Sequence, residues 1–299
     1  MLAEQDRDVV AIFHRQEDMT DFAVETAYCD IRSRKEVLAL KISTRPQTVI
    51  VHCAAITNVD ACEKDKDTCS AVNDRGTAHI CELAQETNAT LIYISTASVF
   101  DGIAGNYQEN DIPKPVNTYS ASKLAGEKHV LTYARGLVIR TIPLGLYSET
   151  RQSKSLLEWI VDCCRRNRDM KLFSDVMLNP LSASTLASMI VRIPSTLERG
   201  ILHLGSRDVV SKADIGREVV SWFPGYAGRV RYVSIDEELS STERPKRMVL
   251  NVDKARSLGL DLPEALADIR RYLASRLPRG AGQSKNLAKI FKNTRIGRP

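Results

Sequence analysis

The sequence predicts an α/β protein with a doubly wound parallel sheet and a smaller C-terminal lobe. Short apolar, β-branched runs alternate with longer helical stretches such as 68–86; the runs are 9–13, 48–55, 90–96 and 136–142. Such alternation is typical of strand–helix–strand crossover units, which place helices on both faces of a parallel sheet. A chain of 299 residues with 43% apolar residues is long enough for one large domain with an appended lobe.

The second half of the chain has a different pattern. After Pro143 we expect a loop at 178–184, a strand at 201–206 and helices at 154–166, 184–193, 212–223 and 263–277. We interpret this half as a smaller lobe threaded onto the carboxyl edge of the sheet. The predicted division is therefore a sheet domain at 1–143, a lobe at 144–277 and a tail at 278–299.

Charge is concentrated in the tail. Residues 279–299 hold six basic residues and no acidic ones, so the net charge of +5 leaves the rest of the chain nearly neutral. Because Phe291 is the only aromatic residue there, we favour a disordered, solvated tail over a nucleic-acid surface. No apolar run has membrane-spanning length and no leader precedes the first strand, so we expect a cytoplasmic protein without membrane contact.

The cysteines indicate reduced thiols. Their number is odd and their spacing irregular, which does not fit a disulfide framework. We predict packing roles and no metal site, since zinc-like spacing is absent from Cys29, Cys53, Cys62, Cys69, Cys81, Cys163 and Cys164.

Three residues point to carbonyl chemistry. Thr96 closes the buried run at 90–96, and the carboxyl ends of such strands are where α/β proteins build sites. Tyr119 and Lys123 are four apart, which puts them on one face of a helix. A phenol has a pKa of about 10, so a neighbouring cation is needed to stabilise its phenolate. We therefore expect these side chains to meet at one carbonyl oxygen.

A Tyr-x-x-x-Lys pair alone occurs by chance in many helices, and the surrounding residues decide the interpretation. The sequence resembles the extended short-chain dehydrogenase/reductases, and most closely their dTDP-4-dehydrorhamnose reductase branch. Two stretches carry the resemblance: an STxxVFDG stretch and a DxPxPxNxY approach to a YxxSK helix. The matching residues are Ser95, Thr96, Val99, Phe100, Asp101, Gly102, Asp111, Pro113, Pro115, Asn117, Tyr119, Ser122 and Lys123.

The resemblance implies a Rossmann-like fold and reduction of a 4-keto nucleotide sugar with NADP or NAD, as in dTDP-rhamnose biosynthesis. It implies that Tyr119 gives the proton and that Thr96 holds the carbonyl oxygen, while Lys123 contacts both Tyr119 and the nicotinamide ribose. The resemblance also makes a homodimer possible. The alternative is a non-catalytic protein on the same fold, similar to the regulatory β subunit of methionine adenosyltransferase, which has similar HCAA, LIYIS and DIPxPxNxY stretches.

Further cofactor contacts follow from the resemblance alone. It places Asp30 and Ile31 beside the adenine and Asn73 where it maintains the geometry of the active-site helix. Arg15 could meet a ribose 2′-phosphate, although a solvated arginine fits equally well. For each of these the simpler reading is packing or helix capping. The turn beneath the cofactor would be formed by Cys53, Ala54 and Ala55.

The sequence departs from the family's pattern in two places, one that bears on the substrate and one at the amino terminus. Ala97, Ser98 and Leu181 replace residues usual in the family, which leaves the sugar open. A dinucleotide fold opens with a strand and a Gly-rich turn, yet the first glycine here is Gly76. Residues 1–8 resemble the end of the family's first helix and 9–13 its second strand. We therefore expect two strands with unpaired edges, and either a start site downstream of the true one or a form without cofactor binding.

Overall fold

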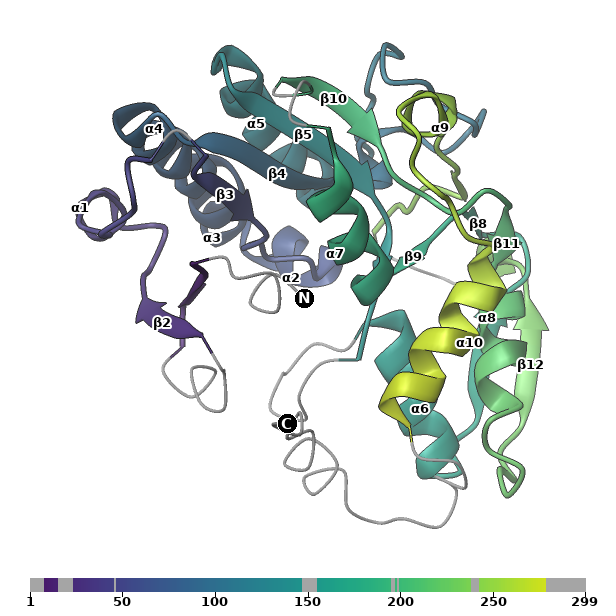
Figure 1. The fold of residues 1–299 in the computed structure, drawn as a ribbon. Helices are drawn as coiled ribbons and strands as arrows, with labels where there is room; N and C mark the ends of the chain where they lie inside the picture. The colour runs from purple at the N-terminus through teal and green to yellow at the C-terminus, as the bar shows by residue number, and fades with distance from the viewer. Residues whose placement is uncertain are drawn as a thin grey trace, which may run out of the picture.

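The computed structural model describes residues 8–15, 24–45, 47–146, 155–194, 197, 199–237 and 242–277. The predicted basic tail after Leu277 and the predicted end of a helix before residue 8 lie outside these ranges. The described chain forms a layered α/β unit with a second lobe (Figure 1).

The main sheet has four parallel strands. They are β3 (Val49–His52), β4 (Thr90–Thr96), β5 (Gly136–Thr141) and β10 (Gly200–His203), in the order β10-β5-β4-β3. All six residues of β5 are buried, as expected for a central parallel strand covered on both faces. The predicted parallel sheet is confirmed.

Helices cover both faces of this sheet. On one face lie α1 (Arg34–Leu38), α4 (Gly76–Thr87) and α5 (Thr118–Thr132), whose apolar side chains share a core with Tyr93 and Val138. On the other lie α7 (Ala183–Arg192) and α9 (Asp253–Ser257), packed with Ile92 and Leu202. The arrangement is therefore doubly wound, and helices from the second half of the chain complete it.

Two more strands form a separate sheet. β1 (Val10–Phe13) and β2 (Glu25–Tyr28) pair in parallel but do not join the four-stranded sheet, and Figure 1 shows the pair set apart from β3. β2 was not predicted from the sequence, because ETAY has no continuous apolar run. The split agrees with the expectation of unpaired edges at this point of the sheet.

Between β3 and β4 the chain is helical throughout. It comprises α2 (Val59–Lys64), α3 (Lys66–Ser70), a π-helical turn at Ala71–Arg75 and then α4. A single helical turn of the π type often marks a functional site. Here it carries Asn73, which is fully buried.

The second lobe has its own core. α6 (Leu156–Arg165), α8 (Lys212–Val220) and α10 (Ala265–Arg276) pack around apolar side chains of β7 (Met170–Phe173). The predicted helices match these bounds within a few residues. The predicted loop at 178–184 instead contains short strands and the start of α7. The lobe's other strands are β6 (Pro143–Leu144), β8 (Met177–Leu178), β9 (Leu181–Ser182), β11 (Val210–Ser211), β12 (Val230–Val233) and β13 (Arg247–Met248), and it has a 3-10 turn at Ile235–Glu237. A second 3-10 turn, Ala97–Val99, follows β4 in the first half of the chain.

Candidate active site

The helix that carries Tyr119 begins at a well-defined cap. Asn117 Oδ1 accepts a hydrogen bond from Ser120 N at 2.9 Å, and Thr118 N donates to Glu63 Oε1 at 2.6 Å. Such a cap satisfies amide groups that the first helical turn leaves unpaired. Asn117 Nδ2 also donates to Glu243 O at 3.0 Å. The cap therefore fixes the start of α5 relative to a segment of the second lobe.

The structure brings Thr96 and Tyr119 together. Thr96 ends β4 with a buried side chain, and its Oγ1 accepts from Ser98 N at 3.1 Å. Burial raises the pKa of Tyr119 to about 12, and a hydrogen bond with the Thr96 side chain opposes this rise. The phenol is therefore protonated at neutral pH, and it lies at the carboxyl end of the central sheet.

Lys123 is held by the backbone of β4 and by the ring of Tyr93. Its Nζ donates to Ile94 O at 2.8 Å and lies 4.0 Å from the centre of the Tyr93 ring. Burial lowers the pKa of Lys123 to about 7, against the opposing charge of Glu127. We expected this cation to lower the pKa of Tyr119. In this structure that pKa is raised, because desolvation of the phenol dominates.

Asn73 connects the turn after β3 to the active-site helix. Its Oδ1 accepts from Ile56 N at 2.8 Å, and its Nδ2 donates to Ile56 O and to Ser122 Oγ, each at 2.9 Å. Ser122 Oγ in turn donates to Tyr119 O at 2.7 Å. One buried amide thus holds both segments, which gives a geometric basis for the positioning role that the resemblance implied.

The turn at residues 53–55 opens from the buried end of β3. His52 Nε2 lies 3.1 Å from Thr77 Oγ1, and the His52 ring stacks on the Tyr93 ring. Because the imidazole is buried, its pKa is lowered to about 3. Cys53 and Ala54 are exposed and Ala55 is half-buried. A neutral histidine therefore anchors a turn whose small side chains leave its backbone accessible.

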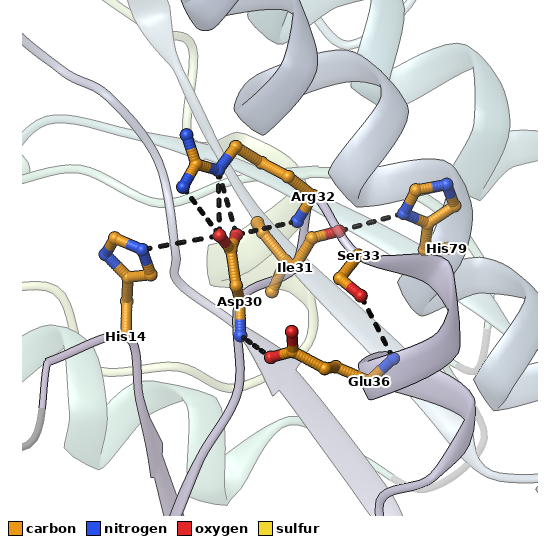
Figure 2. Close-up of polar contacts among 7 residues, drawn as sticks. All are labelled: His14, Asp30, Ile31, Arg32, Ser33, Glu36 and His79. Carbon is orange, nitrogen blue, oxygen red and sulfur yellow. Dashed lines mark hydrogen bonds and ion pairs between the residues drawn. The ribbon is translucent and has the colours of Figure 1, made fainter.

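Asp30 and Ile31 follow the end of β2, and Figure 2 shows their contacts with neighbouring side chains. The Asp30 carboxylate accepts from Arg32 Nε and from Arg32 N, each at 3.0 Å, and His14 Nε2 lies 3.7 Å away. These hydrogen bonds lower the pKa of Asp30 to about 2. Ile31 O accepts from His79 Nδ1 at 2.8 Å. The carboxylate is thus held in place by its own loop.

Several features near the site were missed from the sequence. Arg32 forms the main partner of Asp30, while Arg15, which was expected at the ribose, is exposed at a bend after β1. Beneath α5, Glu127 and Arg140 form a fully buried ion pair with 2.7 Å between Oε2 and Nη2, and Ser95 Oγ donates to the same carboxylate. Glu127 follows Lys123 by one helical turn, but the sequence does not show that its partner is on β5.

The described chain has no Gly-rich turn after its first strand, because its first glycine is Gly76 in α4. All seven cysteines are free, and six of them are buried. Among the described residues no cluster of three or more His, Cys, Asp or Glu side chains could hold a metal. Within the same residues, no helix has the length and apolar character needed to cross a bilayer.

Comparison with known proteins shows the family and the fold of the chain. The family described as RmlD substrate binding domain matches residues 2–277. The chain belongs to this family. Its fold is shared with the dTDP-4-dehydrorhamnose reductase of Bacillus anthracis str. Ames in complex with NADP, at 25% identity and a TM-score of 0.74, covering 87% of this chain and 93% of that one.

Two curated relatives of this RmlD-family chain differ in role. The "probable low-salt glycan biosynthesis reductase Agl14" of Haloferax volcanii is 26% identical over 90% of each chain. The "methionine adenosyltransferase 2 subunit beta" of Rattus norvegicus is 29% identical over 71% of this chain and 65% of its own length. The chain therefore spans slightly less than two thirds of the second relative.

Proposed function

We propose that the protein reduces a 4-keto nucleotide sugar, in the manner of a dTDP-4-dehydrorhamnose reductase, with NADPH or NADH. The observation that carries the proposal is the pairing of Thr96 with a protonated Tyr119 above the buried Lys123. The sugar and the nucleotide are taken from the similar reductases. The catalytic roles follow from the chemistry of the side chains.

Tyr119 supplies the proton. Its raised pKa of about 12 keeps the hydroxyl protonated at neutral pH, as a donor to a carbonyl oxygen requires. Thr96 Oγ1 accepts a hydrogen bond from Ser98 N and is hydrogen-bonded to Tyr119, so its hydroxyl would turn from the phenol to the same substrate oxygen. Two donors can therefore converge on the oxygen that gains charge during reduction.

Lys123 stabilises the phenolate that proton transfer leaves on Tyr119. It is one helical turn away, and its ammonium group lies in a buried environment where charge interactions are strong. Because burial lowers its pKa to about 7, the cation is lost as pH rises above neutrality. We therefore expect turnover to fall on the alkaline side of about pH 7.

The residues at the nicotinamide end fit a bound cofactor, which would supply hydride to the carbonyl carbon. The open turn at 53–55, Tyr119 and Lys123 would hold that end, while Asp30 and Ile31 would lie at the adenine. The pyrophosphate end does not fit, because the described chain has no Gly-rich turn. Cofactor-dependent activity is therefore proposed for a form in which that element is present.

The test is an assay of the chain extended at its amino terminus by a strand and a Gly-rich turn. With dTDP-4-dehydrorhamnose, NADPH or NADH should be consumed, and the Tyr119→Phe variant should be nearly inactive. Cofactor binding is titrated in the same sample, so a failure of binding is separated from a failure of chemistry. Bound cofactor without sugar-dependent consumption would overturn the proposed activity.

A second candidate is a regulatory subunit that does not reduce a sugar. The split sheet and the similarity to the methionine adenosyltransferase β subunit support it. Co-purification with a synthetase partner, together with an inactive extended chain, would favour this candidate over the reductase.

A further inference from the structure

Helix α5 is attached to the end of β4 at three successive turns. Tyr119, Lys123 and Glu127 follow one another at intervals of four residues, so they lie on one face of the helix. The proposed reduction gives a role to the first two and none to Glu127. Each of the three contacts a different residue at the end of β4: Tyr119 the side chain of Thr96, Lys123 Nζ the carbonyl of Ile94, and Glu127 Oε1 the hydroxyl of Ser95.

Arg140 of β5 fixes the Glu127 carboxylate. Its Nε donates to Oε1 at 3.0 Å and its Nη2 donates to Oε2 at 2.7 Å, and both side chains are fully buried. The cost of burying two charges offsets much of the free energy that their attraction supplies, so such a pair is a poor source of stability. Its two parallel hydrogen bonds do fix one geometry. The pair therefore sets the position of Ser95, and with it the end of β4, against α5 and β5.

Titratable side chains from several elements face the Lys123 ammonium group. Burial lowers the pKa of Lys123, and the largest opposing effect comes from the carboxylate of Glu127, ahead of the effects of two thiols. The negative charge one helical turn away is therefore the main attraction that keeps a proton on the buried amine. The facing groups are Glu127 on α5, Tyr93 on β4, His52 and Cys53 at the end of β3, and Cys69 on α3.

We propose that Glu127, fixed by Arg140, is a positioning residue for the reduction. Through Ser95 it ties the end of β4, and with it Thr96, to α5, and it supplies the carboxylate that faces Lys123. Because Glu127 is fully buried, it acts through these neighbours and not by contact with a substrate. The inference rests on the proposed function, since the groups that Glu127 positions are those of that reaction.

Kinetics of the strand-extended chain test the tie through Ser95. Ser95→Ala removes the hydroxyl and leaves the Glu127–Arg140 pair intact, so kcat should fall roughly tenfold while the KM for NADPH stays the same. Thr90→Ala is the matched control, because it removes a hydroxyl that accepts from Arg135 at 2.9 Å at the opposite end of β4. Equal kcat values for the two variants would overturn positioning through Ser95.

The closing experiment titrates Lys123 in the full chain by nuclear magnetic resonance with ¹³C-labelled lysine, and Lys123→Met identifies its signal. The parent should titrate at about pH 7. Glu127→Gln removes the charge and keeps the shape of the side chain, so the midpoint should fall by about one pH unit. Glu218→Gln should leave the midpoint unchanged, because Glu218 forms a similar two-bond pair with Arg270 in the second lobe.

A double variant keeps this test decisive. Glu127→Gln alone leaves Arg140 as an unpaired buried cation, which is strongly destabilising, whereas Glu127→Gln with Arg140→Met removes both charges at similar volume. The double variant should fold and show the same fall in the Lys123 midpoint. A midpoint that stays at the parent's value in the double variant would overturn the proposal. The titration needs no sugar reduction, so it decides the role of Glu127 separately from the proposed function.

Discussion

The two sides of the sheet differ in how complete they are. On the β4–β5 side, the strands are buried, α5 is capped by Asn117, and Thr96, Tyr119 and Lys123 are fixed by hydrogen bonds and packing. On the β1–β2 side, the pair is anchored by Asp8–Arg45 and Ile31–His79, but no strand among the described residues pairs with its inner edge. The difference shows that Thr96, Tyr119 and Lys123 are held in place although the described residues include no Gly-rich turn after the first strand.

The largest effect should come from Tyr119→Phe in the strand-extended chain. Removing the proton donor should lower kcat by roughly 10² to 10⁴, the usual range for a positioned acid. The substitution removes only the hydroxyl and keeps the aromatic ring, so thermal unfolding should change little. Steady-state kinetics with the keto sugar provide the measurement, with Tyr28→Phe on β2 as the matched control. An unchanged kcat would show that the β4–β5 side does not perform the chemistry.

Lys123→Met should change how stability depends on pH. The pKa of Lys123 is about 7 in the folded chain and about 10.4 when unfolded. Between these values the unfolded state binds more protons, so the buried lysine makes stability rise with pH by up to about 1.4 kcal/mol per unit. The cost of burying the cation is greatest below pH 7.

The variant should lack this slope and should be more stable than the parent at pH 6. Urea unfolding of both proteins at pH 6, 7, 8 and 9 measures the difference. If that difference is the same at every pH, the ammonium group is solvated and our account of its burial is wrong.

Asn73→Ala should loosen the turn that links β3 to α5. The change leaves Ile56 N and Ile56 O without their buried partner, which should cost about 1 to 3 kcal/mol of the free energy of unfolding. Gln85→Ala on the exposed side of α4 should stay within about 0.5 kcal/mol. Chemical denaturation measures the free energy of unfolding of both variants. An equal loss in the two would show that Asn73 does not hold β3 and α5 together.

Deleting residues 279–299 should have the smallest effect. These residues lie outside the described part of the chain, and their composition offers few apolar side chains for docking. Thermal unfolding should shift by no more than about a degree or two. A larger loss would mean that the basic segment packs against one of the two sides.

The sequence predicted the strongly apolar strands and the helix of Tyr119 because each has a local signal. The runs at 90–96 and 136–142 became β4 and β5, and Asn117 is a residue type that begins helices. β2 was missed because it is short and half polar, and parallel pairing with β1 supplies most of what stabilises it.

The sequence predicted the helix that carries Tyr119 and Lys123, and their roles stay a prediction. The directions of their pKa shifts could not be predicted, because each depends on burial. Burial arises from contacts far apart in the chain, such as Ile94 O with Lys123 Nζ. The Glu127–Arg140 pair depends on the packing of α5 against β5, which sequence spacing cannot show.

Calorimetric titration of NADPH tests most directly the contrast between the complete β4–β5 side and the incomplete β1–β2 side. A Gly-rich turn supplies several charge-assisted hydrogen bonds of roughly 1.5 to 3 kcal/mol each, so its absence should weaken binding at least about a thousandfold. We expect the 299-residue chain to show no binding at micromolar concentrations, and the chain extended by a strand and a Gly-rich turn to bind. Tight binding by the chain without the extension would contradict the account, because the β1–β2 side would then be complete as it stands.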